Sequence, residues 1–123
     1  MEEQRKEQIE ALEVFCNFNE RFINNVHTLI KELEGKRKED TDKFLEEIIK
    51  GINWEIGILN GTMTLINEKE EHIQKADFNN NILKLSKALQ DKNDSKMAKA
   101  LKEALPMFEN LGKIAKEVLE AEK

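Results

Sequence analysis

The sequence has one cysteine, one proline and no tyrosine. The lone Cys16 cannot form a disulfide within the chain, which excludes a disulfide framework and favours a reducing compartment. We expect it to be a buried small apolar side chain rather than a nucleophile. Long apolar runs are also missing, because the N-terminus begins with charged residues and has no uninterrupted apolar core. We therefore expect no signal peptide, no membrane span and a cytoplasmic location.

Positive charge is the scarcer sign. Lys and Arg total 20 against 25 Asp and Glu, which gives a net charge of -5 and a pI of about 5.2. Because an acidic chain repels phosphate backbones, we expect no nucleic-acid binding. The basic run from Lys36 to Lys38 is followed at once by Glu39 and Asp40, which is typical of a solvated turn. The length of 123 residues fits a single domain, 1–123.

Catalytic and metal-binding motifs are nearly absent. Carboxylate-bridged di-iron bundles need Glu-x-x-His pairs, but the residues three before His27 and His72 are asparagine and lysine. Glu68 and His72 are one helical turn apart, and we interpret them as a solvated pair. There is no glycine-rich phosphate loop, Gly-x-Ser-x-Gly elbow or Cys-x-x-Cys pair. We expect no metal and no cofactor.

The first segment has the clearest helical periodicity. Its apolar seam steps by three and four, with Asn19 as the only polar member: Ile9, Leu12, Cys16, Asn19, Ile23, Val26, Ile30 and Leu33. Three residues seven apart, Phe15, Phe22 and Leu29, widen the seam into the broad stripe of a globular bundle. The pattern predicts a helix from about Arg5 to Glu34, a C-terminal cap at Gly35 and a loop through Asp40.

The third and fourth segments are also helical in pattern. The third has Phe78, Ile82, Leu85 and Leu89 on one face, with Asp77 as its expected cap and an end near Gln90. The fourth repeats the seam spacing at Met97, Leu101, Ala104, Phe108, Leu111, Ala115 and Val118. Asp94 or Ser95 is its expected N-cap. Because the spacing keeps its phase across Pro106, we expect a kink there rather than a break.

The second segment allows two structures. Residues 51–67 read GINWEIGILNGTMTLIN and carry one charge, Glu55, although 37% of the chain is charged. From Thr41, a helical face would contain Leu45, Ile48, Ile49, Ile52, Ile56, Leu59, Met63 and Ile66, with Asp40 or Thr41 as its cap. The alternative is a hairpin about Asn60 and Gly61, because Asn-Gly is a strong signal for a tight β-turn.

Two observations favour the helix. A lone two-stranded hairpin is marginal in water, and no other stretch offers a third strand. In addition, TDKFLEEIIKGINW from Thr41 aligns with DSKMAKALKEALPM from Asp94, and the later copy has clear helical propensity. Each copy follows an apolar helix and a polar turn. The sequence thus predicts an all-α fold, an antiparallel up-down four-helix bundle of two related helical hairpins, with its fourth helix kinked near Pro106.

A helical second segment has more apolar surface than one face holds. Trp54, Ile58 and Leu65, with Gly61 between them, form a second stripe turned away from the core face. Either these side chains close over the core, or they contact a protein partner or a second copy, with the glycine permitting close approach. We take Trp54, Ile58, Gly61 and Leu65 as the candidate partner-binding residues.

One enzyme class passes a literal motif search. All-helical nucleotide pyrophosphatases hold magnesium with Glu-x-x-Glu on one helix and Glu-x-x-Asp on the next, and this chain offers Glu10, Glu13, Glu39 and Asp42. However, Glu39 and Asp42 fall in the predicted loop and helix cap. A magnesium-dependent pyrophosphatase is the alternative to a non-enzymatic contact protein.

Two short stretches carry a resemblance to other proteins. IIKGINW at Ile48 to Trp54, followed by Leu59, and LQDKND at Leu89 to Asp94 resemble small all-helical proteins of unknown function from Gram-positive bacteria. In size and plan the chain also resembles flagellar export chaperones, which are helical bundles that shield a segment of a client protein. The resemblance implies a helical bundle, and with the apolar stripe it predicts a non-enzymatic, adaptor-like or chaperone-like module that binds a partner or itself.

Overall fold

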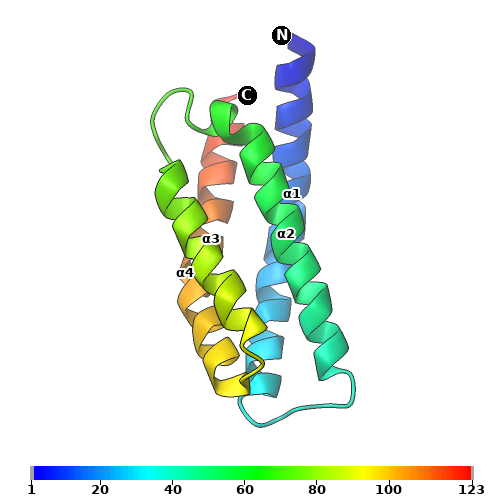
Figure 1. Ribbon diagram of the computed structural model, residues 1–123. Coiled ribbons are helices and arrows are strands. Elements are labelled where there is room, and N and C mark those ends of the chain that lie inside the picture. The colour runs from blue at the N-terminus through cyan, green and yellow to red at the C-terminus, as the bar shows by residue number, and fades with distance from the viewer. Residues whose placement is uncertain (1, 123) are drawn as a thin grey trace.

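The computed structural model describes residues 2–122, which form four helices joined by short loops. These are α1 (Glu2–Leu33), α2 (Thr41–Ile66), α3 (Lys75–Gln90) and α4 (Asp94–Ala121). The helices lie side by side and alternate in direction, and α1 begins at the same end of the bundle where α4 ends (Figure 1). The predicted antiparallel four-helix bundle is confirmed.

The four helices do not contribute equally to the bundle. Helix α1 packs against α4 and α2 along its length, whereas α3 packs against α4 alone. Within residues 2–122, no Cα atom of α3 lies within 8 Å of one in α1 or α2. Helix α3 accordingly buries few side chains, namely Phe78, Leu85 and Leu89. The trunk of the molecule is therefore α1, α2 and α4, with α3 attached to the outside of α4.

The buried stripe of α1 is centred on its phenylalanines. Phe15 is completely buried and Phe22 is 2% exposed, whereas Ile9, Cys16 and Ile23 of the predicted seam are only partly buried. The reason is that α1 lies between α2 and α4, so the most buried line points between its two neighbours. The residues that were expected to widen the seam form its centre instead.

The first loop has the expected turn residue and the expected cap position, but the cap side chain makes no hydrogen bond. Gly35 has a φ of 123°, a left-handed conformation that favours glycine. Asp40 occupies the N-cap of α2, but its side chain makes no capping hydrogen bond. The buried Thr41 hydroxyl accepts a hydrogen bond from the Lys38 backbone N–H at 2.8 Å and donates one to Glu32 Oε1 at 2.7 Å. Thr41 therefore fixes the loop to the end of α1.

The caps of α3 and α4 were predicted at the wrong residues. Gln74, not Asp77, caps α3, and its Oε1 accepts a hydrogen bond from the Asp77 backbone N–H at 2.8 Å. Asn93 caps α4 instead of Asp94 or Ser95, with its Oδ1 accepting from the backbone N–H three residues later at 3.0 Å. In both cases an amide side chain just outside the helix satisfies a donor of the first turn.

Two interruptions suggested by the sequence leave their helices unbroken. Helix α4 continues through Pro106, as the phase of its apolar residues indicated. Helix α2 continues through Asn60 and Gly61, so the hairpin does not form. In the same turn, the Thr62 hydroxyl donates to the Ile58 carbonyl at 2.8 Å, so this buried polar group is satisfied within α2. Across residues 2–122, none of the helices combines the length and the apolarity needed to cross a membrane.

Candidate functional site

The acidic residues of the pyrophosphatase motif lie far apart. Glu10 and Glu13 are on α1, whereas Glu39 is in the first loop and Asp42 is in the first turn of α2. The helix between Glu13 and that loop has about 20 residues and is therefore about 30 Å long. Asp42 instead pairs with Arg37 at 2.9 Å. Among the residues that the structure describes, no three or more His, Cys, Asp or Glu side chains form a group that could hold a metal ion.

The histidines and the cysteine are also separate. His27 is exposed on α1. His72 lies in the turn after α2, where its Nδ1 is 3.4 Å from Glu70 Oε1, so the predicted pair with Glu68 on one helix face is wrong because the helix has already ended. Cys16 is half-buried, and burial raises the pKa of its thiol, which disfavours the reactive thiolate.

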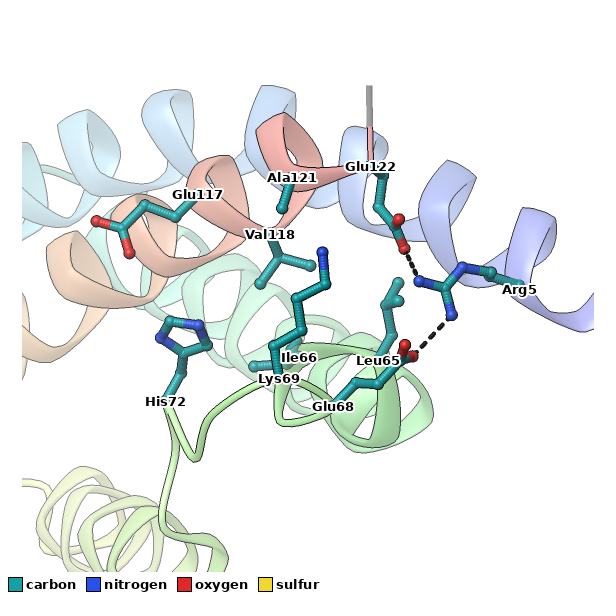
Figure 2. A pocket seen from close by; sticks show the side chains of 10 residues that line it. All are labelled: Arg5, Leu65, Ile66, Glu68, Lys69, His72, Glu117, Val118, Ala121 and Glu122. Carbon is teal, nitrogen blue, oxygen red and sulfur yellow. Dashed lines mark hydrogen bonds and ion pairs between the residues drawn. The ribbon is translucent and has the colours of Figure 1, made fainter.

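A small cavity of about 50 Å³ lies at the end of the bundle where α1 begins and α2 and α4 end (Figure 2). At its mouth Arg5 forms ion pairs with Glu68, at 2.7 Å, and with Glu122. The hydrogen bond from Arg5 lowers the pKa of the Glu68 carboxyl. The cavity has room for a few water molecules. Its ion pairs tie the three helix ends together.

The four candidate contact residues divide between surface and core. Trp54 is 38% exposed, Ile58 is half-buried and Gly61 is exposed. Leu65 is only 5% exposed, because it lies at the cavity in Figure 2, between the start of α1 and the end of α4. The Trp54 ring rests on Phe18 of α1, with ring centroids 4.8 Å apart. Trp54, Ile58 and Gly61 are therefore accessible from outside the bundle, whereas Leu65 belongs to the core.

The outer face of α2 carries a line of exposed residues that we call the α2 strip. Its first five members follow helical steps of four and three along one face, and the sixth lies in the turn just after α2 ends at Ile66: Lys50, Trp54, Gly57, Gly61, Thr64 and Glu68. All six are exposed. The only charged residue between the two ends of the strip is Glu55, which is completely buried. The middle of the strip is therefore uncharged.

A shallow groove of about 260 Å³ runs beside the strip, between α1 and α2. It is lined by Gln4, Glu7, Gln8 and Ala11 on α1 and by Gly57, Ile58, Gly61 and Thr62 on α2. The Gln8 amide Nε2 crosses the groove and donates to the Gly61 carbonyl at 3.1 Å and to Thr64 Oγ1 at 3.2 Å. The strip is thus continuous with a partly polar groove.

The helical glycines fall into two kinds. A Cβ added at Gly51 would lie 2.8 Å from the ring of Phe22, and one added at Gly112 would lie 2.7 Å from an amide nitrogen of α1. At these two positions close packing within the chain requires glycine. A Cβ added at Gly57 or Gly61 would meet nothing within 4 Å. Packing within the chain does not explain these two residues of the strip.

Glu55 is a site that the sequence reasoning missed. It is 0% exposed, and neither carboxyl oxygen has a hydrogen-bond partner among the described residues. Burial raises its pKa to about 8. The available signal was its spacing, three residues after Ile52 and four before Leu59, both of which are buried. A charge on the core line of a helix predicts a buried, neutral acid.

Asn19 is a second buried polar residue with an unpaired side-chain oxygen within residues 2–122. Its Nδ2 donates to the Phe108 carbonyl at 3.1 Å, but its Oδ1 has no partner among the described residues.

Comparisons with known proteins give a family but no function. A family model described as a domain of unknown function (DUF8042) matches residues 10–114, which include most of the bundle. No curated protein and no solved structure matches the chain.

Proposed function

The chain belongs to the DUF8042 family of domains of unknown function, and we propose that it is a non-enzymatic protein-contact module. The contact surface in this proposal is the α2 strip with the groove beside it. The observation that carries the proposal is an exposed tryptophan within an uncharged, glycine-containing helix face, in a chain of which 37% is charged. Tryptophan is among the residues that contribute most to protein interfaces.

The placement of the ionisable groups supports contact rather than catalysis. Glu55 is the carboxyl with the most strongly raised pKa, but it is completely buried and lines neither of the cavities described above. A general acid or base must come within hydrogen-bond reach of its substrate. The carboxylates of the pyrophosphatase motif, Glu10, Glu13, Glu39 and Asp42, lie on separate parts of the chain. We therefore propose structural roles for these groups.

The partner in this proposal is another polypeptide that lays a helix along α2. A helical segment can follow the strip with its own apolar residues against Trp54 and Ile58, while Gln8 and Thr64 offer hydrogen bonds at the edge. A highly charged partner would lose hydration here without meeting an opposite charge in the middle of the strip. A cytoplasmic location and the absence of nucleic-acid binding remain predictions from Cys16 and the net charge of -5.

The proposal is tested by covalent capture from the strip. A photo-crosslinking amino acid in place of exposed Asn60 should give an adduct with one discrete polypeptide in cells that make the full chain, and Gly61→Leu should abolish that adduct. The same amino acid in place of Asn80, exposed on α3, is the matched control. If both positions give the same pattern, or if the Asn60 position gives no adduct, the α2 strip is not a contact surface.

A pair of substitutions separates contact from core packing. Trp54→Ala should keep the helical content and reduce the melting temperature only slightly, because the ring is 38% exposed, while it weakens the contact. Leu65→Glu should instead lower the free energy of unfolding by about 3 kcal/mol or more, since it places a charge in the core. Circular dichroism with chemical denaturation measures both. Equal destabilisation by the two changes would assign Trp54 to the core.

A further inference from the structure

We infer that the occupant of the α2 strip is the same strip of a second copy of this chain, packed antiparallel about a two-fold axis. The inference rests on the proposed function, because it names the partner of the same surface. It is carried by the order of residues along the strip, by the charges at its two ends and by the two glycines at its centre.

The strip reads symmetrically about its midpoint at Leu59. In an antiparallel pair centred there, Gly57 of one copy faces Gly61 of the other, and Trp54 faces Thr64. The next positions outward are Lys50, on the same face, and Glu68, in the turn just past the end of α2, and these two also face each other. A two-fold axis repeats every one of these contacts, as an isologous interface requires.

The charges at the ends of the strip select the antiparallel orientation. Lys50 is exposed at one end, and Glu68 lies in the turn just past the other end of α2, where its side chain is 46% exposed and pairs with Arg5 of its own chain. Antiparallel packing brings the lysine of each copy to the cluster of Arg5, Glu68 and Glu122 on the other, in which two carboxylates share one cation, so each lysine meets a net negative charge. Parallel packing would place lysine against lysine and glutamate against glutamate. Because the chain carries a net charge of -5, a neutral strip with complementary ends is where two copies meet with least repulsion.

The two central glycines of the strip would let the α2 helices of the two copies pack closely. Each glycine in a helix interior lowers helix stability by about 1 kcal/mol relative to alanine. At Gly57 and Gly61 no atom within 4 Å of the added Cβ offsets this loss. Facing glycines let two helix backbones approach more closely than the usual interaxial distance of about 8 to 10 Å. Trp54 of each copy can then cover the crossing point.

The purified full chain tests this inference by its mass at different concentrations. We expect light scattering to show a monomer that becomes a dimer between about 1 μM and 1 mM, because one helix face is smaller than the roughly 800 Å² per partner of a standard interface. Gly57→Leu and Gly61→Leu should each raise the dissociation constant at least tenfold. Both variants should fold, since the added side chain has open space, and Asn80→Leu on α3 should leave dimerisation unchanged.

A charge exchange tests the orientation. Lys50→Glu places glutamate opposite Glu68 twice per dimer. Glu68→Lys places lysine opposite Lys50 twice and also removes the ion pair with Arg5 inside each copy, a loss that mixing the two variants does not restore. Each variant alone should dimerise roughly tenfold more weakly. Mixed one to one, the two variants should form a heterodimer about as strong as the original dimer, because both opposed pairs are then of opposite sign. The differences should shrink at high salt.

The outcomes separate this inference from the proposed function. A chain that stays monomeric to about 1 mM, or a dimer that Gly61→Leu and the charge exchange leave unchanged, overturns the inference. If the Asn60 crosslinker then captures a different polypeptide, the contact function stands with another partner. If it captures nothing, both fail. Self-crosslinking that Gly61→Leu abolishes supports both.

Discussion

Raising the pH from about 5 to about 9 is expected to destabilise this bundle through one residue, Glu55. The pKa of the buried carboxyl is about 8 in the folded chain, against 4.5 for the ordinary group. The folded state thus holds a proton that the unfolded state releases. This contribution to stability is fully present below pH 4.5 and is lost as the pH rises through about 8.

The expected loss is large for a domain of this size. The difference between the two pKa values corresponds to at most roughly 5 kcal/mol of the free energy of unfolding. A domain of this kind is typically stable by about 5 to 15 kcal/mol, so the bundle should be close to its unfolding midpoint in much less denaturant at about pH 9. Urea unfolding at several pH values measures the effect directly.

Two substitutions of Glu55 identify it as the source. Glu55→Gln keeps the shape but cannot titrate, so the fall in stability between about pH 5 and 9 should disappear. Glu55→Leu should be more stable than the original chain at about pH 9, because it removes a buried charge. The carboxyls of Glu68 and Asp94 have lowered pKa values and act in the opposite direction at lower pH. If the Gln variant keeps the slope, the pH dependence belongs to another group.

The protonation of Glu55 also affects the charge of the proposed contact surface. Glu55 follows Trp54 in the chain, but the two side chains leave α2 about 100° apart, so one is buried in the core and the other is exposed on the strip. Because the buried Glu55 is protonated, it adds no negative charge beneath the exposed face of α2. The segment between Lys50 and Glu68 is therefore neutral on both faces at pH 7, although its composition includes a carboxyl.

Periodicity predicted the helices because it is a local property of the chain. The end of the first helix fell one residue from Leu33, and Gly35 was found in its turn with a φ of 123°. The continuity of α2 through Asn60 and Gly61 was decided correctly, because burial of one long apolar face outweighs the turn preference of two residues. Strong patterns in long segments are sufficient for this level of description.

Side-chain exposure was harder to predict because it depends on how the helices are arranged. Leu65 belongs to the same stripe as Trp54, but the ends of α1 and α4 cover it and leave Trp54 open. No pattern within α2 contains that information. The same applies to Gly57 and Gly51, which look alike in the sequence but differ in whether a phenylalanine ring lies against them.

The second large effect on the free energy of unfolding is expected from adding a side chain at Gly51 and removing the ring at Phe22. Gly51 is buried, and a Cβ there would lie 2.8 Å from one ring atom of Phe22 and 3.0 Å from another. That ring cannot move freely, because it is stacked on Phe18 and packs edge-on against Phe108. Gly51→Leu should therefore lower the free energy of unfolding by about 3 kcal/mol through overpacking, despite its better helix propensity.

Removing the Phe22 ring should reduce the cost of Gly51→Leu. Phe22→Ala alone should lower the free energy of unfolding by about 3 to 5 kcal/mol, because it leaves a cavity between α1, α2 and α4. With both changes, the new leucine occupies part of that cavity, so the double variant should be more stable than the sum of the single losses predicts by about 2 kcal/mol or more. Chemical denaturation of the four proteins completes the cycle. Strict additivity would mean that Gly51 and Phe22 do not share the space between α1 and α2.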